Sequence, residues 1–127
     1  MAGNNKRPVY LNLLRIRLPV GAVVSILHRV TGLLLVASLP LLLLLLQHSL
    51  TSAEDYERVN IFLRTLPARI LLLVLIIVLA HHSFAGVRHL LHDLDIGISR
   101  SGGRRGAWLV LAAVATVGTI AAGRLFL

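Results

Sequence analysis

Residues 30–46 contain no charged side chain, and this long apolar stretch most limits the structures that the chain can adopt. With its flanks it reaches the roughly 20 residues that a helix needs to cross the hydrocarbon core of a bilayer. Residues 66–87 and 107–123 form two further long apolar stretches. Because 57% of the 127 residues are hydrophobic, a soluble fold of this size could not bury the apolar surface. The sequence therefore predicts an all-α integral membrane protein with three transmembrane helices.

We expect the chain to form one membrane-anchor domain over residues 1–127. Its predicted parts are a cytoplasmic arm and three spans, at residues 1–19, about 22–47, about 66–90 and about 106–126. The chain has no cysteine, so it has no disulfide framework and no thiolate site for a metal or an iron–sulfur cluster.

Two segments between the spans have patterns of their own. Ser52 precedes Asp55 by three residues, which is a pattern that caps the start of a helix. Tyr56 and Leu63 follow at helical spacing, so we expect a short amphipathic interfacial helix between the first and second spans. By contrast, the glycines of RSGGRRG, residues 100–106, predict a flexible loop before the third span.

The net charge of +8 is distributed unevenly. Eight lysines and arginines flank the spans on one side and four lie on the other, namely Lys6, Arg7, Arg15, Arg17, Arg88, Arg100, Arg104 and Arg105 against Arg58, Arg64, Arg69 and Arg124. The positive-inside rule then predicts a multi-pass protein with a cytoplasmic N-terminus and a C-terminus on the outer side of the membrane. We expect this membrane to be the bacterial inner membrane, with the C-terminus in the periplasm. No basic face interleaved with aromatic residues accompanies the charge, so we expect no nucleic-acid partner.

The first span carries polar side chains where it begins, in VVSILHRVTGLLL, residues 23–35. Arg29 and Gly32 follow Ser25 by four and seven residues, and His28 precedes Gly32 by four, so these residues share one side of a helix. Ionisable groups inside a membrane are candidates for function. The alternative is that Arg29 is an interfacial anchor whose charge reaches water.

The second span carries two stripes of polar residues about 100° apart around a helix. One stripe consists of His82, Gly86, His89 and Asp93, and the other of His81, Ala85, Arg88 and His92.

His82 is the histidine best placed within the hydrocarbon, because it lies two turns deeper than His89. A neutral imidazole there can ligate a metal, and Gly86 leaves room for a bulky planar cofactor, a description that haem fits. His81 and His82 cannot approach one iron from opposite sides, so a six-coordinate haem needs a second ligand from elsewhere. Two alternatives stay open, histidines that only pack helices together and a zinc site of His89, His92 and Asp93.

Three segments together resemble the cytochrome b membrane-anchor subunits of succinate dehydrogenase. They are RPVYLNLLRIRLP in the arm, SILHRVTG in the first span and HSFAGVRHLLHDL in the second. The motifs S-x-x-H-R-x-[ST]-G and H-x-x-x-G-x-R-H-x-x-x-D are specific in combination, and the resemblance covers most of the chain.

This resemblance implies a cofactor, a substrate and residues that contact them. His82 would be an axial ligand of the iron of one haem b, which is shared with a second small membrane-anchor subunit. Ser25 and Arg29 would bind ubiquinone near the cytoplasmic surface. His28, Arg29 and His89 would lie at the haem propionates. His81 and His92 are additions to the family's simplest pattern.

The function implied by the resemblance is that of an anchor subunit, which is not an enzyme as an isolated chain. It would hold the flavoprotein and iron–sulfur subunits at the membrane, among membrane lipid, and pass electrons from succinate to quinone. Alternatives are the anchor of a fumarate reductase, a structural anchor without haem, and a small transporter that uses the histidines as a relay.

Overall fold

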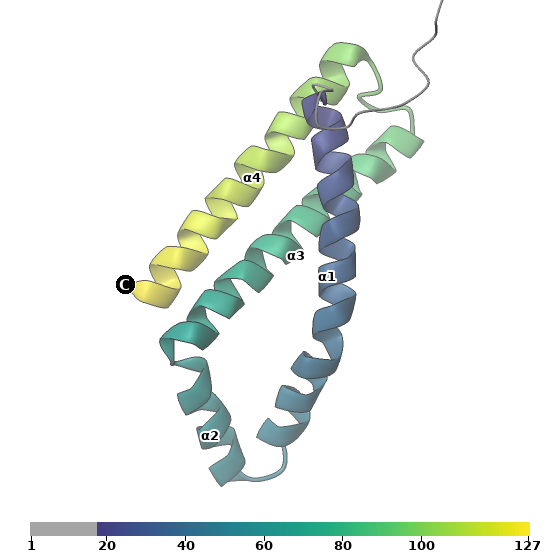
Figure 1. The fold of residues 1–127 in the computed structure, drawn as a ribbon. Helices are drawn as coiled ribbons and strands as arrows, with labels where there is room; N and C mark the ends of the chain where they lie inside the picture. Colours follow the sequence, from purple (N-terminus) through teal and green to yellow (C-terminus); the bar gives the residue numbers. More distant parts are fainter. Residues whose placement is uncertain (1–17) are drawn as a thin grey trace, which may run out of the picture.

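The computed structural model describes residues 18–127, in which four α-helices follow one another along the chain (Figure 1). They are α1 (Val20–Ser49), α2 (Ala53–Leu63), α3 (Leu66–Asp93) and α4 (Arg100–Phe126). The helices α1, α3 and α4 are each long and apolar enough to cross a membrane, and α2 is the short helix between the first two of them. The predicted fold class is therefore confirmed. Most of the predicted arm, with Lys6, Arg7, Arg15 and Arg17, lies outside the described residues.

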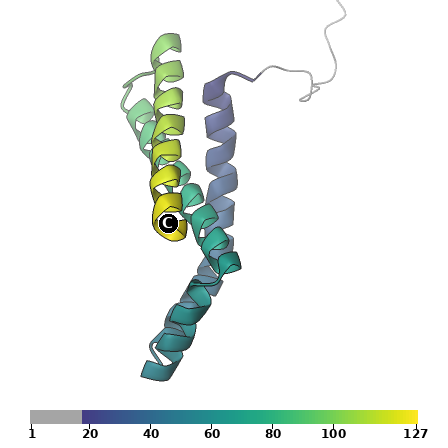
Figure 2. The same ribbon diagram turned by 90° about the vertical axis from the view of Figure 1, so that its left-hand side faces the viewer.

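The three long helices meet at the end of the bundle where α1 begins, α3 ends and α4 begins (Figure 1). We call this the basic end, because Arg88, Arg100, Arg104 and Arg105 lie there. Helix α4 runs alongside α3 over most of its length, whereas α1 and α3 diverge away from the basic end. At the opposite end, α2 and the last turns of α1 extend beyond the C-terminus of α4 (Figure 2).

Small side chains fill the centre of the bundle near the basic end. Val24 of α1, Ala85 of α3 and the α4 residues Ala107 and Val110 are buried together. Such side chains let helices approach closely, which matters in lipid because helix association there depends on close packing. Many large apolar side chains point outward instead, and Leu33, for example, is 71% exposed. The bundle therefore presents lipid with an apolar surface.

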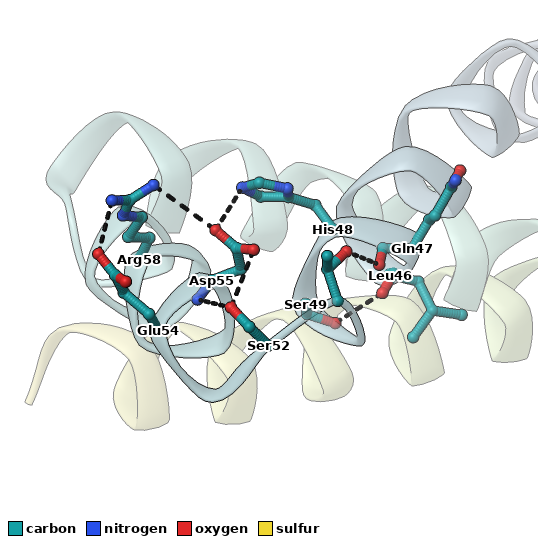
Figure 3. A network of polar contacts seen from close by, with 9 residues as sticks. Leu46, Gln47, His48, Ser49, Ser52, Glu54, Asp55 and Arg58 are labelled. Atoms are coloured by element: carbon teal, nitrogen blue, oxygen red, sulfur yellow. Dashed lines mark hydrogen bonds and ion pairs between the residues drawn. The ribbon is translucent and has the colours of Figure 1, made fainter.

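A polar network holds the start of α2 at the opposite end (Figure 3). The Ser52 hydroxyl accepts a hydrogen bond from the backbone N–H of Asp55 at 3.0 Å, which confirms the predicted cap. The Asp55 carboxylate also lies 3.6 Å from His48 at the end of α1 and 3.6 Å from Arg58. This contact across the α1–α2 turn joins the start of α2 to the end of α1.

The prediction of a flexible loop at residues 100–106 was wrong, because this segment forms the first turns of α4. The Ser99 hydroxyl caps the helix by accepting a hydrogen bond from the Gly102 N–H at 3.0 Å. The chain reverses before the helix at Asp95 and Gly97, both of which have positive φ. A Cβ at Gly102 would lie 3.0 Å from the Gly97 carbonyl oxygen, so this glycine permits close packing at the helix start.

Candidate functional site

His82 lies on the side of α3 that contacts α1. Its Nδ1 atom is 3.2 Å from the carbonyl oxygen of His28 and 3.5 Å from the Oγ1 atom of Thr31. A carbonyl oxygen can only accept a hydrogen bond, so this contact assigns the ring proton to Nδ1. The lone pair of the neutral imidazole is then on Nε2, which is the nitrogen available to a metal.

Thr31 is buried in α1 beside this imidazole. Its hydroxyl lies 2.8 Å from the carbonyl oxygen of Leu27 and donates a hydrogen bond within its own helix. The hydroxyl oxygen therefore faces His82 Nδ1 with a lone pair, as a second acceptor for the same proton. Sequence reasoning did not assign a role to Thr31, although it follows His28 by three residues and so lies on the same side of α1.

Two glycines allow the imidazoles of His28 and His82 to interleave between α1 and α3. The two rings stack with centroids 4.3 Å apart and planes 8° from parallel. A Cβ at Gly32 would lie 3.0 Å from Cε1 of His82, and a Cβ at Gly86 would lie 3.4 Å from Nε2 of His28. Because stacking covers the face of the His82 ring, it leaves the in-plane lone pair of Nε2 unobstructed by His28.

His89 is the third member of this imidazole cluster. Its ring centroid is 5.0 Å from that of His28, with the planes tilted by 52°. The structure thus brings together His28, His82 and His89, three of the residues singled out in the sequence. Ser25 is half-buried and Arg29 is exposed on α1, and neither side chain forms a hydrogen bond or ion pair within residues 18–127.

His81 occupies a different environment from its neighbour. Its side chain is 5% exposed, and it shares a helix face with Ala85, which is buried in the core with residues of α1 and α4. Both ring nitrogens are buried and have no hydrogen-bond partner within the described part of the chain. His81 therefore presents no nitrogen to the outside of this subunit.

Arg88 lies on the same stripe of α3 as His81, where α1 and α4 both approach it. Its Nη2 atom donates a hydrogen bond to the carbonyl oxygen of Gly103 in α4 at 3.2 Å. A Cβ at Gly21 would lie 3.2 Å from Nη2, and one at Gly106 would lie 3.5 Å from Nε. Gly21 thus makes room for this guanidinium, whereas a Cβ at Gly106 would be in ordinary van der Waals contact with it.

The zinc interpretation of His89, His92 and Asp93 finds no support. Among residues 18–127, no three histidine, aspartate or glutamate side chains come together in a group that could hold a metal ion. A haem differs from zinc in this respect, since it needs only one imidazole from this chain if a partner subunit supplies the other ligand.

The comparisons with known proteins agree on one family. Residues 3–121 match the family model of the succinate dehydrogenase/fumarate reductase transmembrane subunit. The chain is also 33% identical over 121 residues to the succinate dehydrogenase cytochrome b556 subunit of Coxiella burnetii, across 94% of this chain and 96% of that protein. This chain therefore belongs to the family of succinate dehydrogenase/fumarate reductase transmembrane subunits, as a membrane anchor that is not catalytic by itself.

Proposed function

We propose that this subunit binds one haem b through His82 and helps to form the ubiquinone-reduction site of a succinate dehydrogenase. The observation that carries the haem assignment is the contact of 3.2 Å between His82 Nδ1 and the His28 carbonyl oxygen. Metal-ligating histidines characteristically donate their other ring N–H to such an acceptor, which fixes the ring orientation and raises the basicity of the ligating nitrogen. The related protein is itself named as a cytochrome b subunit.

Haem would supply a site that accepts and returns one electron at a time. The residues present fit this group, because Nε2 of His82 is the free nitrogen of an oriented ring. His81 does not fit, because both of its nitrogens are buried inside this chain. We assign His28 and His89 to the edge of the haem, where imidazoles can donate hydrogen bonds to its propionates, with Arg29 adding positive charge.

The single oriented imidazole and the sequence without cysteine indicate which partner subunits this chain would need. It offers one oriented imidazole on the α1-facing side of α3, so a second small anchor subunit would provide the other protein ligand of the haem iron. It has no cysteine, so electrons would come from a cluster in the iron–sulfur subunit, which the flavoprotein supplies from succinate. We place the basic end in the cytoplasm, on the inner side of a bacterial inner membrane, with the C-terminus in the periplasm.

Ser25 and Arg29 are the residues that we assign to ubiquinone. They lie one turn apart on α1 near the basic end, and neither is used in a hydrogen bond within the described residues. Ser25 would donate a hydrogen bond to a quinone carbonyl oxygen. Arg29 would stabilise negative charge that develops on the quinone oxygens during reduction, which a fixed cation does well in a dry site. Fumarate reduction would use the same contacts in reverse, but the name of the relative favours succinate oxidation.

The haem assignment is tested by the reduced-minus-oxidised spectrum of the complex co-expressed with its other subunits. We expect His82→Ala to abolish the b-type signal. The matched control is His81→Leu, which replaces a buried imidazole without hydrogen bonds by an apolar side chain of similar size and should keep the signal. Immunoblots of the membranes establish that each variant is inserted. Loss of the signal in the His81 variant alone would transfer the ligand role to His81.

A further inference from the structure

Two cavities lie against the first turns of α4. A cavity of about 580 Å³ is lined by residues from the start of α1, the end of α3 and the start of α4. The second, of about 1030 Å³, is a broadly open depression along α4 alone. Both are lined by Arg100, Arg104 and Trp108. These three residues recur every four positions and therefore lie along one side of the helix. The two cavities are thus adjacent parts of one surface.

The smaller cavity is strongly basic. Arg88, Arg100 and Arg104 line it, whereas no aspartate or glutamate lines either cavity. Within residues 18–127 all ion pairs lie at the opposite end of the bundle, so no carboxylate pairs with these arginines. Arginines four residues apart on a helix repel each other. The Nε atom of Arg88 is, in addition, buried without an acceptor from the described residues.

The larger cavity continues from these arginines onto an apolar surface. Its wall passes from Arg104 to the indole of Trp108 and then to Leu109 and Ala112. Tryptophan is typical of the level where headgroups meet the acyl chains. Along the start of α4 the chemistry thus changes from guanidinium to indole to aliphatic, which matches a lipid phosphate, its glycerol region and its acyl chains in order.

From this arrangement we propose that the basic end of the bundle binds an anionic phospholipid. Its phosphate would occupy the smaller cavity between Arg100 and Arg104, and its acyl chains would run along Leu109 and Ala112. Basic pockets between transmembrane helices are suited to anionic headgroups. Arg88, the arginine of α3 that lines this cavity, belongs to the stripe about 100° from His82. None of His82, Ser25 and Arg29 lines the cavity, so the lipid would not share these residues with haem or quinone.

The proposal is tested on the complete complex, purified in neutral detergent, stripped of lipid and examined by native mass spectrometry. Three probes are compared, namely phosphatidylglycerol, zwitterionic phosphatidylcholine and inorganic phosphate. We expect phosphatidylglycerol to be retained more strongly than phosphatidylcholine, and its retention to weaken as salt is raised. Each arginine contributes about a fivefold factor in affinity for an anionic lipid, so R100Q/R104Q should bind phosphatidylglycerol roughly 25-fold more weakly.

Arg124→Gln is the matched control, because Arg124 is an exposed arginine of the same helix at its other end. Its affinity for phosphatidylglycerol should equal that of the wild type. Equal retention of the two lipids by the wild-type complex would overturn the proposal, and this comparison needs no variant to fold. Retention of inorganic phosphate in place of lipid would also overturn it. So would unchanged lipid binding in R100Q/R104Q with loss of the soluble subunits, since that result would mark the surface as a protein contact.

Discussion

The contact between Gly32 and His82 can be tested by adding a single methyl group. In Gly32→Ala the new Cβ would lie 3.0 Å from Cε1 and 3.4 Å from Nδ1 of His82. Comfortable contacts between carbon atoms begin near ~3.5 Å, so the ring must retreat by about 0.5 Å. The ring is stacked on His28, and its Nδ1 is 3.2 Å from the His28 carbonyl oxygen. A retreat of that size would stretch this contact to about 3.7 Å, which is beyond hydrogen-bond range.

The expected cost follows from these two effects. Overpacking typically costs about 1–3 kcal/mol, and the lost hydrogen bond costs about 1 kcal/mol more. The gain in helix propensity from glycine to alanine returns about 1 kcal/mol. A net loss of about 1–3 kcal/mol corresponds to haem binding that is weaker by roughly fivefold to 150-fold.

The assay is the ratio of haem to protein in the purified complex, together with the midpoint potential of the haem that remains. Gly123→Ala is the control, because a Cβ at Gly123 meets nothing within 4 Å and the substitution changes only helix propensity. Gly32→Ala should lower haem content and shift the midpoint potential, whereas Gly123→Ala should change neither. Identical haem content and potential in the two variants would refute the conclusion that α1 orients the His82 ring.

Three further substitutions probe other contacts. Arg29→Leu should reduce succinate–quinone activity at least tenfold while succinate oxidation by a soluble dye is maintained, and equal losses in both assays would instead indicate failed assembly. Arg69→Gln removes the hydrogen bond of 3.1 Å from Nη1 to the Leu125 carbonyl oxygen, so it should lower stability by about 1–3 kcal/mol in thermal unfolding and leave the haem spectrum unchanged. Ser52→Ala removes the cap on the Asp55 N–H, so amide exchange in α2 should accelerate about fivefold, in line with a loss of about 1 kcal/mol.

The three long helices could be predicted because lipid leaves the backbone of a long apolar segment no alternative to internal hydrogen bonding. The conformation of residues 100–106 could not be predicted, because glycine occurs both in flexible loops and where backbones pack closely. The position of the Gly97 carbonyl oxygen shows that Gly102 permits close packing, and the sequence does not reveal that position. The different environments of His81 and His82 could not be predicted from the sequence either. The two residues are adjacent, and which of them is buried depends on where α4 packs.

The two polar stripes of α3 differ in their neighbours, since the His82 stripe contacts α1 whereas the His81 stripe packs against both α1 and α4, and this difference separates haem binding from assembly. His82 and Gly86 face α1, where the His28 ring stacks on the His82 ring and lies against Gly86. Arg88 lies on the other stripe and bonds to α4 through the Gly103 carbonyl oxygen. A change that shifts α1 therefore moves the hydrogen-bond acceptor of the His82 ring directly. A change at the α4 contact reaches this ring only indirectly, through the backbone of α3 or through α1, whose Val24 packs with Ala107 and Val110 of α4. Substitutions of α3 residues that face α1 should thus yield assembled complex that is poor in haem. Substitutions of α3 residues that contact α4 should yield less complex, with a normal haem content.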